Sequence, residues 1–146
     1  MIELKEQYYL PVGQSINRFL EKVVLKETKG IGLPTKHLGD VQSCTSPRCF
    51  VIDVKSINVA KKFHMPNLSS QKKLFKWLQD EQNTLMYFFI FYEEVNNSFA
   101  INSTILKHIE EIHPDCLVVQ AQGLGVLQIK NMNKLKFIDR MNRRVL

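Results

Sequence analysis

The chain has 146 residues, of which 45% are hydrophobic and 23% charged, with a formal net charge of +6. This length predicts one ordinary globular domain and excludes two. The first ten residues carry acids where a secretory signal needs basic residues, and the longest apolar run, residues 85–91, is too short to span a bilayer. Three cysteines are too few for a disulfide framework, so we expect a cytoplasmic protein without a membrane partner.

The positive charge is concentrated in two segments. Residues 59–79 carry five lysines and no acid, and residues 130–146 carry six basic residues and one acid. This distribution favours a polyanion partner, most simply nucleic acid, although a solvated basic surface gives the same pattern. Lys130 and Lys134 in the second segment suit phosphate contacts, which position a protein on DNA without specifying sequence.

The first part of the chain predicts a helix and then a hairpin. Residues 14–28 form an amphipathic helix, which "GIGLP" at 30–34 ends. The apolar residues on its buried face are Ile16, Phe19, Leu20, Val23 and Val24. Residues 36–44 and 49–56 are predicted strands around the turn "TSPR". An irregular or extended segment follows, because Pro66 disfavours a regular element there.

The middle of the chain predicts a second helix and a buried strand. Residues 69–82 begin with a serine N-cap candidate and read as a helix. Its apolar face comprises Leu74, Phe75 and Leu78. Residues 85–95 form a strand buried on both faces, and the asparagines at 96 and 97 suit a two-residue turn into a further strand at 98–101.

The last part of the chain predicts a mixture of helices and strands. Residues 103–112 have a helical apolar pattern, and residues 116–130 give two strands around Gly123 and Gly125. A basic C-terminal helix is expected to place its apolar residues, Leu135, Ile138 and Met141, on one face. The predicted fold class is therefore α/β, with residues 1–146 forming a single domain around a mixed β-sheet flanked by helices.

The turn "TSPR" sets the register of the predicted hairpin. If Cys44 faces Cys49, Asp40 lies opposite Asp53, and Lys55 shares the face of Asp53. Opposed residues have Cβ atoms about 5 Å apart, so the two carboxylates repel each other unless a cation such as Mg²⁺ binds both. Lys55 could orient or help deprotonate an attacking water and offset transition-state charge, and together these groups suit phosphodiester hydrolysis.

A solvated hairpin face, with Lys55 bridging the two acids, would give the same pattern. The spacing of the three residues is also common by chance. The apolar "FVI" before Asp53 favours the catalytic interpretation, because it implies a strand inside the sheet, where uncompensated charge is costly. A β-bulge in either strand would shift the register.

The residues "GD" at 39–40 and "DVK" at 53–55, separated by twelve residues, resemble the motif of the PD-(D/E)XK nuclease superfamily. The predicted element order is similar to that superfamily's αβββαβ core, so the resemblance implies a restriction-endonuclease-like fold. The stretch "VKSINVAKKFHMPN" at 54–67 resembles the PvuII-type restriction endonucleases, which are short and homodimeric. The resemblance runs from about residue 36 to residue 95.

The resemblance implies a role for each residue of the motif. Asp40, Asp53 and the Val54 carbonyl would bind Mg²⁺, and Lys55 would serve the water nucleophile. Many members of the superfamily also carry an acid near the metal on the first helix, where this chain has Glu21. Glu21 lies well off the apolar centre of its helix, so a solvated glutamate is the favoured interpretation.

The DNA contacts implied by the resemblance follow the second strand. Asn58 closes the "KSIN" match, and Lys61 and Lys62 come directly after it. His64 would contact base edges in the major groove, because it lies where the relatives present base-reading histidines. The glutamines at 120, 122 and 128 are alternative readers of bases or sugars, or else an exposed sheet face.

The chain departs from the family pattern in three places. Gly39 stands where the motif has proline, Asp53 stands where glutamate is commoner, and the histidine segment is shorter with a single histidine. The family tolerates the first two changes. The third means that the DNA target cannot be carried over from the relatives.

The function implied is that of a type II restriction endonuclease. Such an enzyme hydrolyses phosphodiester bonds of double-stranded DNA at a short palindromic sequence, with Mg²⁺ and no nucleotide cofactor, as a homodimer. One alternative is a structure-selective nuclease of the same fold, such as a Holliday-junction resolvase. Another, from a different class, is a non-catalytic DNA-binding module.

Overall fold

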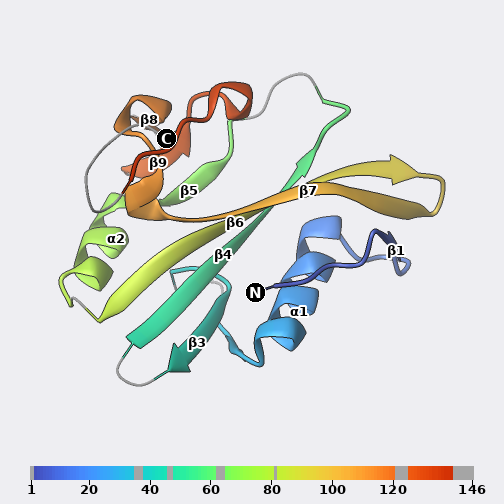
Figure 1. Ribbon diagram of the computed structural model, residues 1–146, viewed down its shortest axis with the longest axis horizontal. Helices are drawn as coiled ribbons and strands as arrows, with labels where there is room; N and C mark the ends of the chain where they lie inside the picture. The colour runs from blue at the N-terminus through green and yellow to red at the C-terminus, as the bar shows by residue number, and fades with distance from the viewer. Residues whose placement is uncertain are drawn as a thin grey trace.

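The computed structural model describes residues 2–34, 38–45, 48–61, 65–80, 82–120 and 125–139. A six-stranded mixed sheet, in the order β1-β7-β6-β4-β3-β2, forms the centre of the molecule (Figure 1). Its strands are β1 (Gln7–Tyr9), β2 (Ile31–Gly32), β3 (Val41–Thr45), β4 (Arg48–Asn58), β6 (Asn83–Val95) and β7 (Ser98–His108). A smaller sheet in the order β5-β9-β8 comprises β5 (Asn67–Ser70), β8 (Leu117–Val119) and β9 (Val126–Ile129).

Two α-helices accompany these sheets, α1 (Ile16–Thr28) and α2 (Gln71–Leu78). In Figure 1, α2 and the smaller sheet lie together at one side of the large sheet, and α1 lies toward the other. β2, β3 and β4 form an antiparallel meander, and β4 then pairs in parallel with β6. The result is a mixed α/β domain, as the sequence predicts.

The large sheet separates two hydrophobic clusters. On one face, Leu20 and Val24 of α1 belong to a cluster with Ile52 of β4 and Phe88 of β6. The other face carries a cluster that includes Val51 and Ile57 of β4, Tyr87 and Phe89 of β6, Leu74 of α2 and Ile129 of β9. Because successive strand residues point to opposite faces, β4 and β6 contribute to both clusters, and each carries a continuous apolar run, residues 50–52 in β4 and 85–92 in β6.

The predicted first helix and hairpin are confirmed. α1 begins after Ser15, whose hydroxyl accepts a hydrogen bond from the backbone N–H of Arg18 at 3.2 Å. In the hairpin, Cys44 pairs with Cys49 and Val41 with Ile52, which is the register expected from the turn. The turn residues 46 and 47 lie outside the described part of the chain.

The predicted buried strand and its turn are also confirmed. β6 is buried from Tyr87 to Ile90, and Val95 pairs with Ser98 across the two-residue turn. Asn96 has φ +57°, a left-handed conformation that asparagine adopts more readily than most residues.

The predicted helix at 103–112 is wrong. β7 continues to His108 and is followed by a short 3₁₀ helix, Ile109–Glu111. Ile105 packs against one hydrophobic cluster and Leu106 against the other. Because these adjacent apolar residues contact opposite clusters, the strand shows no clean alternation, and its apolar residues can mimic a helical period.

The second predicted helix is shorter than expected. α2 covers only Gln71–Leu78, because the residues before it pair as β5 with β9. Ser70 occupies the N-cap position but makes no side-chain capping bond. Leu74 is buried as expected, whereas Phe75 is 59% exposed.

The predicted basic C-terminal helix is wrong within the described residues. A 3₁₀ turn, Met132–Lys134, is followed by extended backbone at Leu135 and a β-bridge between Phe137 and Ile112. The backbone amide of Ile138 also bonds the Glu111 carbonyl at 2.8 Å, so this segment pairs with its neighbours instead of coiling. Met141 lies outside the described residues, and in the described part no helix is long and apolar enough to cross a membrane.

The placement of Leu20 and Phe75 can be tested by truncation. Leu20 is fully buried, so Leu20→Ala should lower the free energy of unfolding by about 2–5 kcal/mol. Phe75→Ala should change it by less than about 1 kcal/mol, because that ring is largely exposed. Urea unfolding followed by circular dichroism measures both, and a larger loss for Phe75→Ala would contradict the observed face of α2.

Candidate active site

Asp40 is held in place by the backbone on both sides of it. Its N–H donates to the Ile52 carbonyl at 2.9 Å, and its own carbonyl accepts from the N–H of Leu33 at 2.9 Å. The preceding Gly39 has φ +77°, and a Cβ there would lie 2.1 Å from Cγ1 of Val51. A side chain at residue 39 would therefore displace the loop that carries Asp40.

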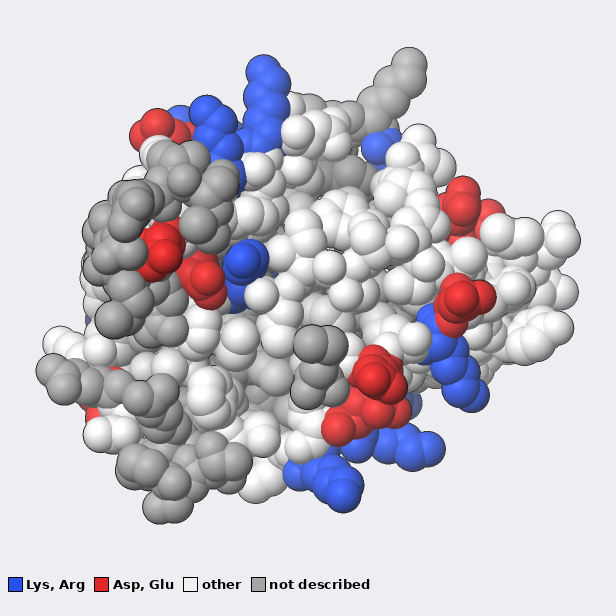
Figure 2. Space-filling model, viewed as in Figure 1, with Lys and Arg blue, Asp and Glu red and all other residues white. Residues whose placement is uncertain are grey.

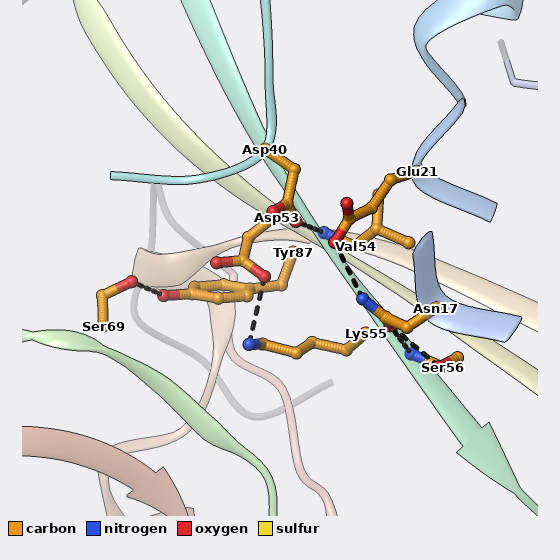
Figure 3. Close-up of polar contacts among 9 residues, drawn as sticks. All are labelled: Asn17, Glu21, Asp40, Asp53, Val54, Lys55, Ser56, Ser69 and Tyr87. Atoms are coloured by element: carbon orange, nitrogen blue, oxygen red, sulfur yellow. Dashed lines mark hydrogen bonds and ion pairs between the residues drawn. The ribbon is translucent and has the colours of Figure 1, made fainter. Parts of the chain in front are cut away.

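The carboxylate of Asp40 reaches across to β4. Its Oδ2 accepts a hydrogen bond from the backbone N–H of Val54 at 2.7 Å (Figure 3). The N–H and C=O of one strand residue point toward the same neighbouring strand, so the Val54 carbonyl also faces the edge where Asp40 lies. Asp40 precedes Val41 and Asp53 follows Ile52, so both aspartates lie directly beyond the last pair of the β3–β4 ladder.

Asp53 lies inside the sheet and is paired with Lys55. The aspartate is only 8% exposed, and its Oδ1 lies 3.2 Å from Nζ of Lys55. Asp53 stands beside Tyr87 in the parallel β4–β6 ladder, and Figure 3 shows both side chains on one side of β4. The Tyr87 hydroxyl is hydrogen-bonded to the hydroxyl of Ser69 on β5. The hairpin thus gathers Asp40, Asp53 and Lys55 as the sequence predicts.

Burial raises the pKa of Asp53 to about 7. The Lys55 ammonium lowers this pKa, whereas the negative charges of Asp40 and Glu21 raise it further. Burial and the charge of Asp53 also raise the pKa of the Tyr87 hydroxyl, which keeps it protonated. The site therefore holds more negative charge than Lys55 compensates.

Glu21 joins this cluster, so its interpretation as a solvated side chain is wrong. Burial raises its pKa, as do the charge of Asp40 and a hydrogen bond between the two carboxyl groups. Asn17, one turn earlier on α1, donates from Nδ2 to Oε1 of Glu21 at 2.9 Å. Its Oδ1 accepts from the N–H and the hydroxyl of Ser56, at 3.0 and 2.8 Å. Asn17 therefore fixes α1 to the β4 residue that follows Lys55.

A cleft of about 730 Å³ opens beside the carboxylates. Glu21, Asp40 and Asp53 line it, together with residues of α1, β5 and the start of α2. Lys55 is not among the residues that line the cleft, although it contacts Asp53. A phosphate-sized group in the cleft can therefore reach Asp40 and Asp53 from solvent.

The donor set suits a hard cation. In the described part of the chain, no group of three or more His, Cys, Asp or Glu side chains stands in metal-ligating geometry. Mg²⁺ does not need such a group, because it is usually held by one or two carboxylates and keeps several waters. Asp40, Asp53 and the Val54 carbonyl offer hard oxygen donors at one point. A divalent cation there would offset the repulsion that raises the pKa of Asp53.

The predicted DNA contacts that the structure describes do not line this cleft. Asn58 ends β4, and its Oδ1 accepts from the N–H of Ala60 at 3.0 Å, which stabilises the turn leading to the exposed Lys61. Lys130 and Lys134 are exposed near the smaller sheet. None of these four described residues lines the cleft.

The remaining candidate readers are placed in part. Lys62 and His64 lie outside the described residues, as does Gln122, so their roles stay predictions. Gln128 is described, and its side-chain amide donates to the Met65 carbonyl at 3.0 Å and to Oδ1 of Asn67 at 3.1 Å. Its amide group therefore links β9 to β5.

Comparison with known proteins adds no assignment. No protein-family model matches the chain, and no curated protein matches it. The chemistry of the site must therefore be argued from its own residues.

The loop before Asp40 should be intolerant of any side chain at residue 39. Gly39→Ala combines positive φ with a steric clash, and it should lower the free energy of unfolding by more than about 2 kcal/mol. Gly13→Ala is the matched control, since Gly13 has φ +81° but nothing within 4 Å of the added Cβ. Chemical denaturation compares them, and equal losses would show that the contact with Val51 is unimportant.

The raised pKa of Asp53 predicts a pH-dependent cost in metal-free buffer. The folded protein holds a proton on Asp53 up to about pH 7, whereas the ordinary pKa of an aspartate is 3.8. Stability should therefore fall as pH rises between these values. Asp53→Asn removes this cost and should be more stable than the wild type at pH 8, on the order of a few kcal/mol, with the gain vanishing near pH 4.

Thermal unfolding in EDTA from pH 4 to pH 9 measures this difference. Asp115→Asn is the control, because that carboxylate is 81% exposed and should show no gain that grows with pH. A variant Asp53→Asn that is less stable than the wild type at pH 8 would contradict the assigned environment.

Proposed function

We propose that the protein is a Mg²⁺-dependent endonuclease that hydrolyses phosphodiester bonds in double-stranded DNA, in the manner of a type II restriction enzyme. The observation that carries this proposal is the convergence of Asp40, Asp53 and Lys55 where β3 begins beside β4. The repulsion between the carboxylates and the burial of Asp53 favour a divalent cation, and the adjacent cleft gives a phosphate access to Asp40 and Asp53.

The order of elements supports the same proposal. α1 is followed by the meander β2-β3-β4, then by the short β5 and α2, and then by β6 parallel to β4. Apart from β5, this order is similar to the αβββαβ core of the PD-(D/E)XK nucleases that the motif resembles. Asp40 immediately precedes β3 and Asp53 lies in the middle of β4, the positions that the resemblance implies.

Each polar group has a task in the proposed reaction. Asp40, Asp53 and the Val54 carbonyl would hold Mg²⁺, which supplies Lewis-acid polarisation of the scissile phosphate. Lys55, fixed by its ion pair with Asp53, orients the attacking water and offsets negative charge that develops on the phosphoryl oxygens. By the family's chemistry the products carry 5′-phosphate and 3′-hydroxyl ends.

Cutting both strands of a short symmetric sequence requires two such sites. Because the described part of one chain offers a single carboxylate cluster of this kind, we propose a homodimer with twofold symmetry. Two identical sites related by a twofold axis would address the two strands of a palindrome in the same way.

The proposal is tested by digesting linear plasmid with purified protein and Mg²⁺. The wild type should give discrete fragments, whereas Asp53→Asn and Lys55→Ala should lower the cleavage rate at least about 100-fold, because each removes a group that acts on the reacting phosphate. Binding of duplex DNA, measured by fluorescence anisotropy in EDTA, should change little. Lys72→Ala and Asp115→Asn are controls for the loss of one surface charge and should cut normally.

The outcome also separates the alternatives. Cleavage confined to branched DNA would replace the restriction-enzyme proposal with a structure-selective nuclease. Binding without Mg²⁺-dependent cleavage of any linear, supercoiled or branched substrate would leave a non-catalytic DNA-binding module.

A further inference from the structure

The cleft beside the carboxylates has basic residues on two opposite walls. One wall is a single face of α1, on which Arg18, Glu21, Lys22 and Leu25 follow at helical spacing. The other wall is formed by β5 and the beginning of α2, where Lys73 lines the cleft. Asp40 and Asp53 lie between the walls.

We infer that Lys22 and Lys73 are phosphate-binding residues that hold the DNA backbone on either side of the scissile phosphate. This inference rests on the proposed function and assigns substrate contacts to Lys73, which belongs to the basic segment 59–79, and to Lys22, which lies outside both basic segments of the sequence. The carboxylates repel a phosphate that approaches them. Cations on both sides of the carboxylates offset that repulsion for the neighbouring phosphates.

Arg18 also lines the cleft, on the wall of α1. Its positive charge lowers the pKa of Glu21, so part of its field is already balanced within the cleft. Lys22 and Lys73 are exposed on opposite walls of the cleft. Ser70 also lines the wall of Lys73, and its hydroxyl can donate a hydrogen bond to a phosphate oxygen.

The charge distribution over the surface favours this local site over a broad basic face. Figure 2 shows basic and acidic side chains lying side by side around one face of the molecule, among its described residues. A polyanion that bound such a mixed surface without a preferred path would lose affinity equally on removal of any lysine. A polyanion that follows the cleft would depend on the two cleft lysines above the others.

The chain offers a matched control for each wall. Lys26 lies one turn after Lys22 on α1, and Lys72 lies next to Lys73 on α2. All four lysines are exposed, but only Lys22 and Lys73 line the cleft. Replacing any of them by alanine changes the net charge by the same amount and is not expected to disturb folding.

The experiment measures binding of a fluorescein-labelled, mixed-sequence DNA duplex in EDTA across a series of salt concentrations. Lys22→Ala and Lys73→Ala should each weaken binding about three- to tenfold at 0.1 M salt and lower the slope of log K against log salt by about 1. The double variant should lower this slope by about 2. Lys26→Ala and Lys72→Ala should stay within about twofold of the wild type.

Two outcomes decide the inference. Cleft variants that bind no worse than Lys26→Ala and Lys72→Ala would overturn it, and the plasmid digest would then still decide the proposed nuclease on its own. The predicted loss in the cleft variants would support the inference even if no substrate is cut. The inference would also be overturned if the cleft substitutions weakened binding of single-stranded RNA more than binding of duplex DNA. The cleft would then hold an RNA backbone.

Discussion

The buried carboxylate of Asp53 is the constraint on which the rest of the site depends. β4 lies between β3 and β6, and the neighbours of Asp53 along it, Val51, Ile52 and Val54, belong to the two hydrophobic clusters. A carboxylate in such surroundings loses most of its hydration and needs compensation. Lys55 supplies part of it from the same strand, while Asp40 and Glu21 add charge of the same sign. A divalent cation bound by the carboxylates would offset the negative charge that Lys55 leaves uncompensated.

The contact between Tyr87 and Ser69 connects this constraint to the wall of the cleft. Tyr87 stands beside Asp53 in the large sheet, and Ser69 belongs to the smaller sheet and lines the cleft. The bonded pair of hydroxyls thus fixes β5 against β6 at the level of the carboxylates. Lys73 lies four residues after Ser69, so the hydrogen bond between Tyr87 and Ser69 also helps to position α2. The wall of the cleft that carries Lys73 and the carboxylate cluster are therefore parts of one packed unit.

The hairpin could be predicted from sequence because its geometry is local. A short turn sets the register, and the two-residue period of a strand then determines which side chains share a face. Glu21 could not be placed in this way, since its distance from Asp40 depends on how α1 packs on the sheet. The strand at 103–108 has a helix-like apolar pattern, because the adjacent residues Ile105 and Leu106 contact opposite clusters and no regular alternation results. The C-terminal segment failed for a related reason, because its backbone pairing with residues 111–113 depends on contacts distant in sequence.

The left-handed backbone at Gly39 has a consequence for how this kind of motif is recognised. Proline is confined to φ near −65°, whereas residue 39 has φ +77°. Proline therefore cannot adopt the backbone conformation of Gly39 in this chain, and a proline at this position would require a different loop before Asp40. Substitution of proline for Gly39 would disrupt the loop before Asp40. Pattern searches that demand proline at this position would pass over chains built in this way, even where the carboxylates behind it are arranged alike.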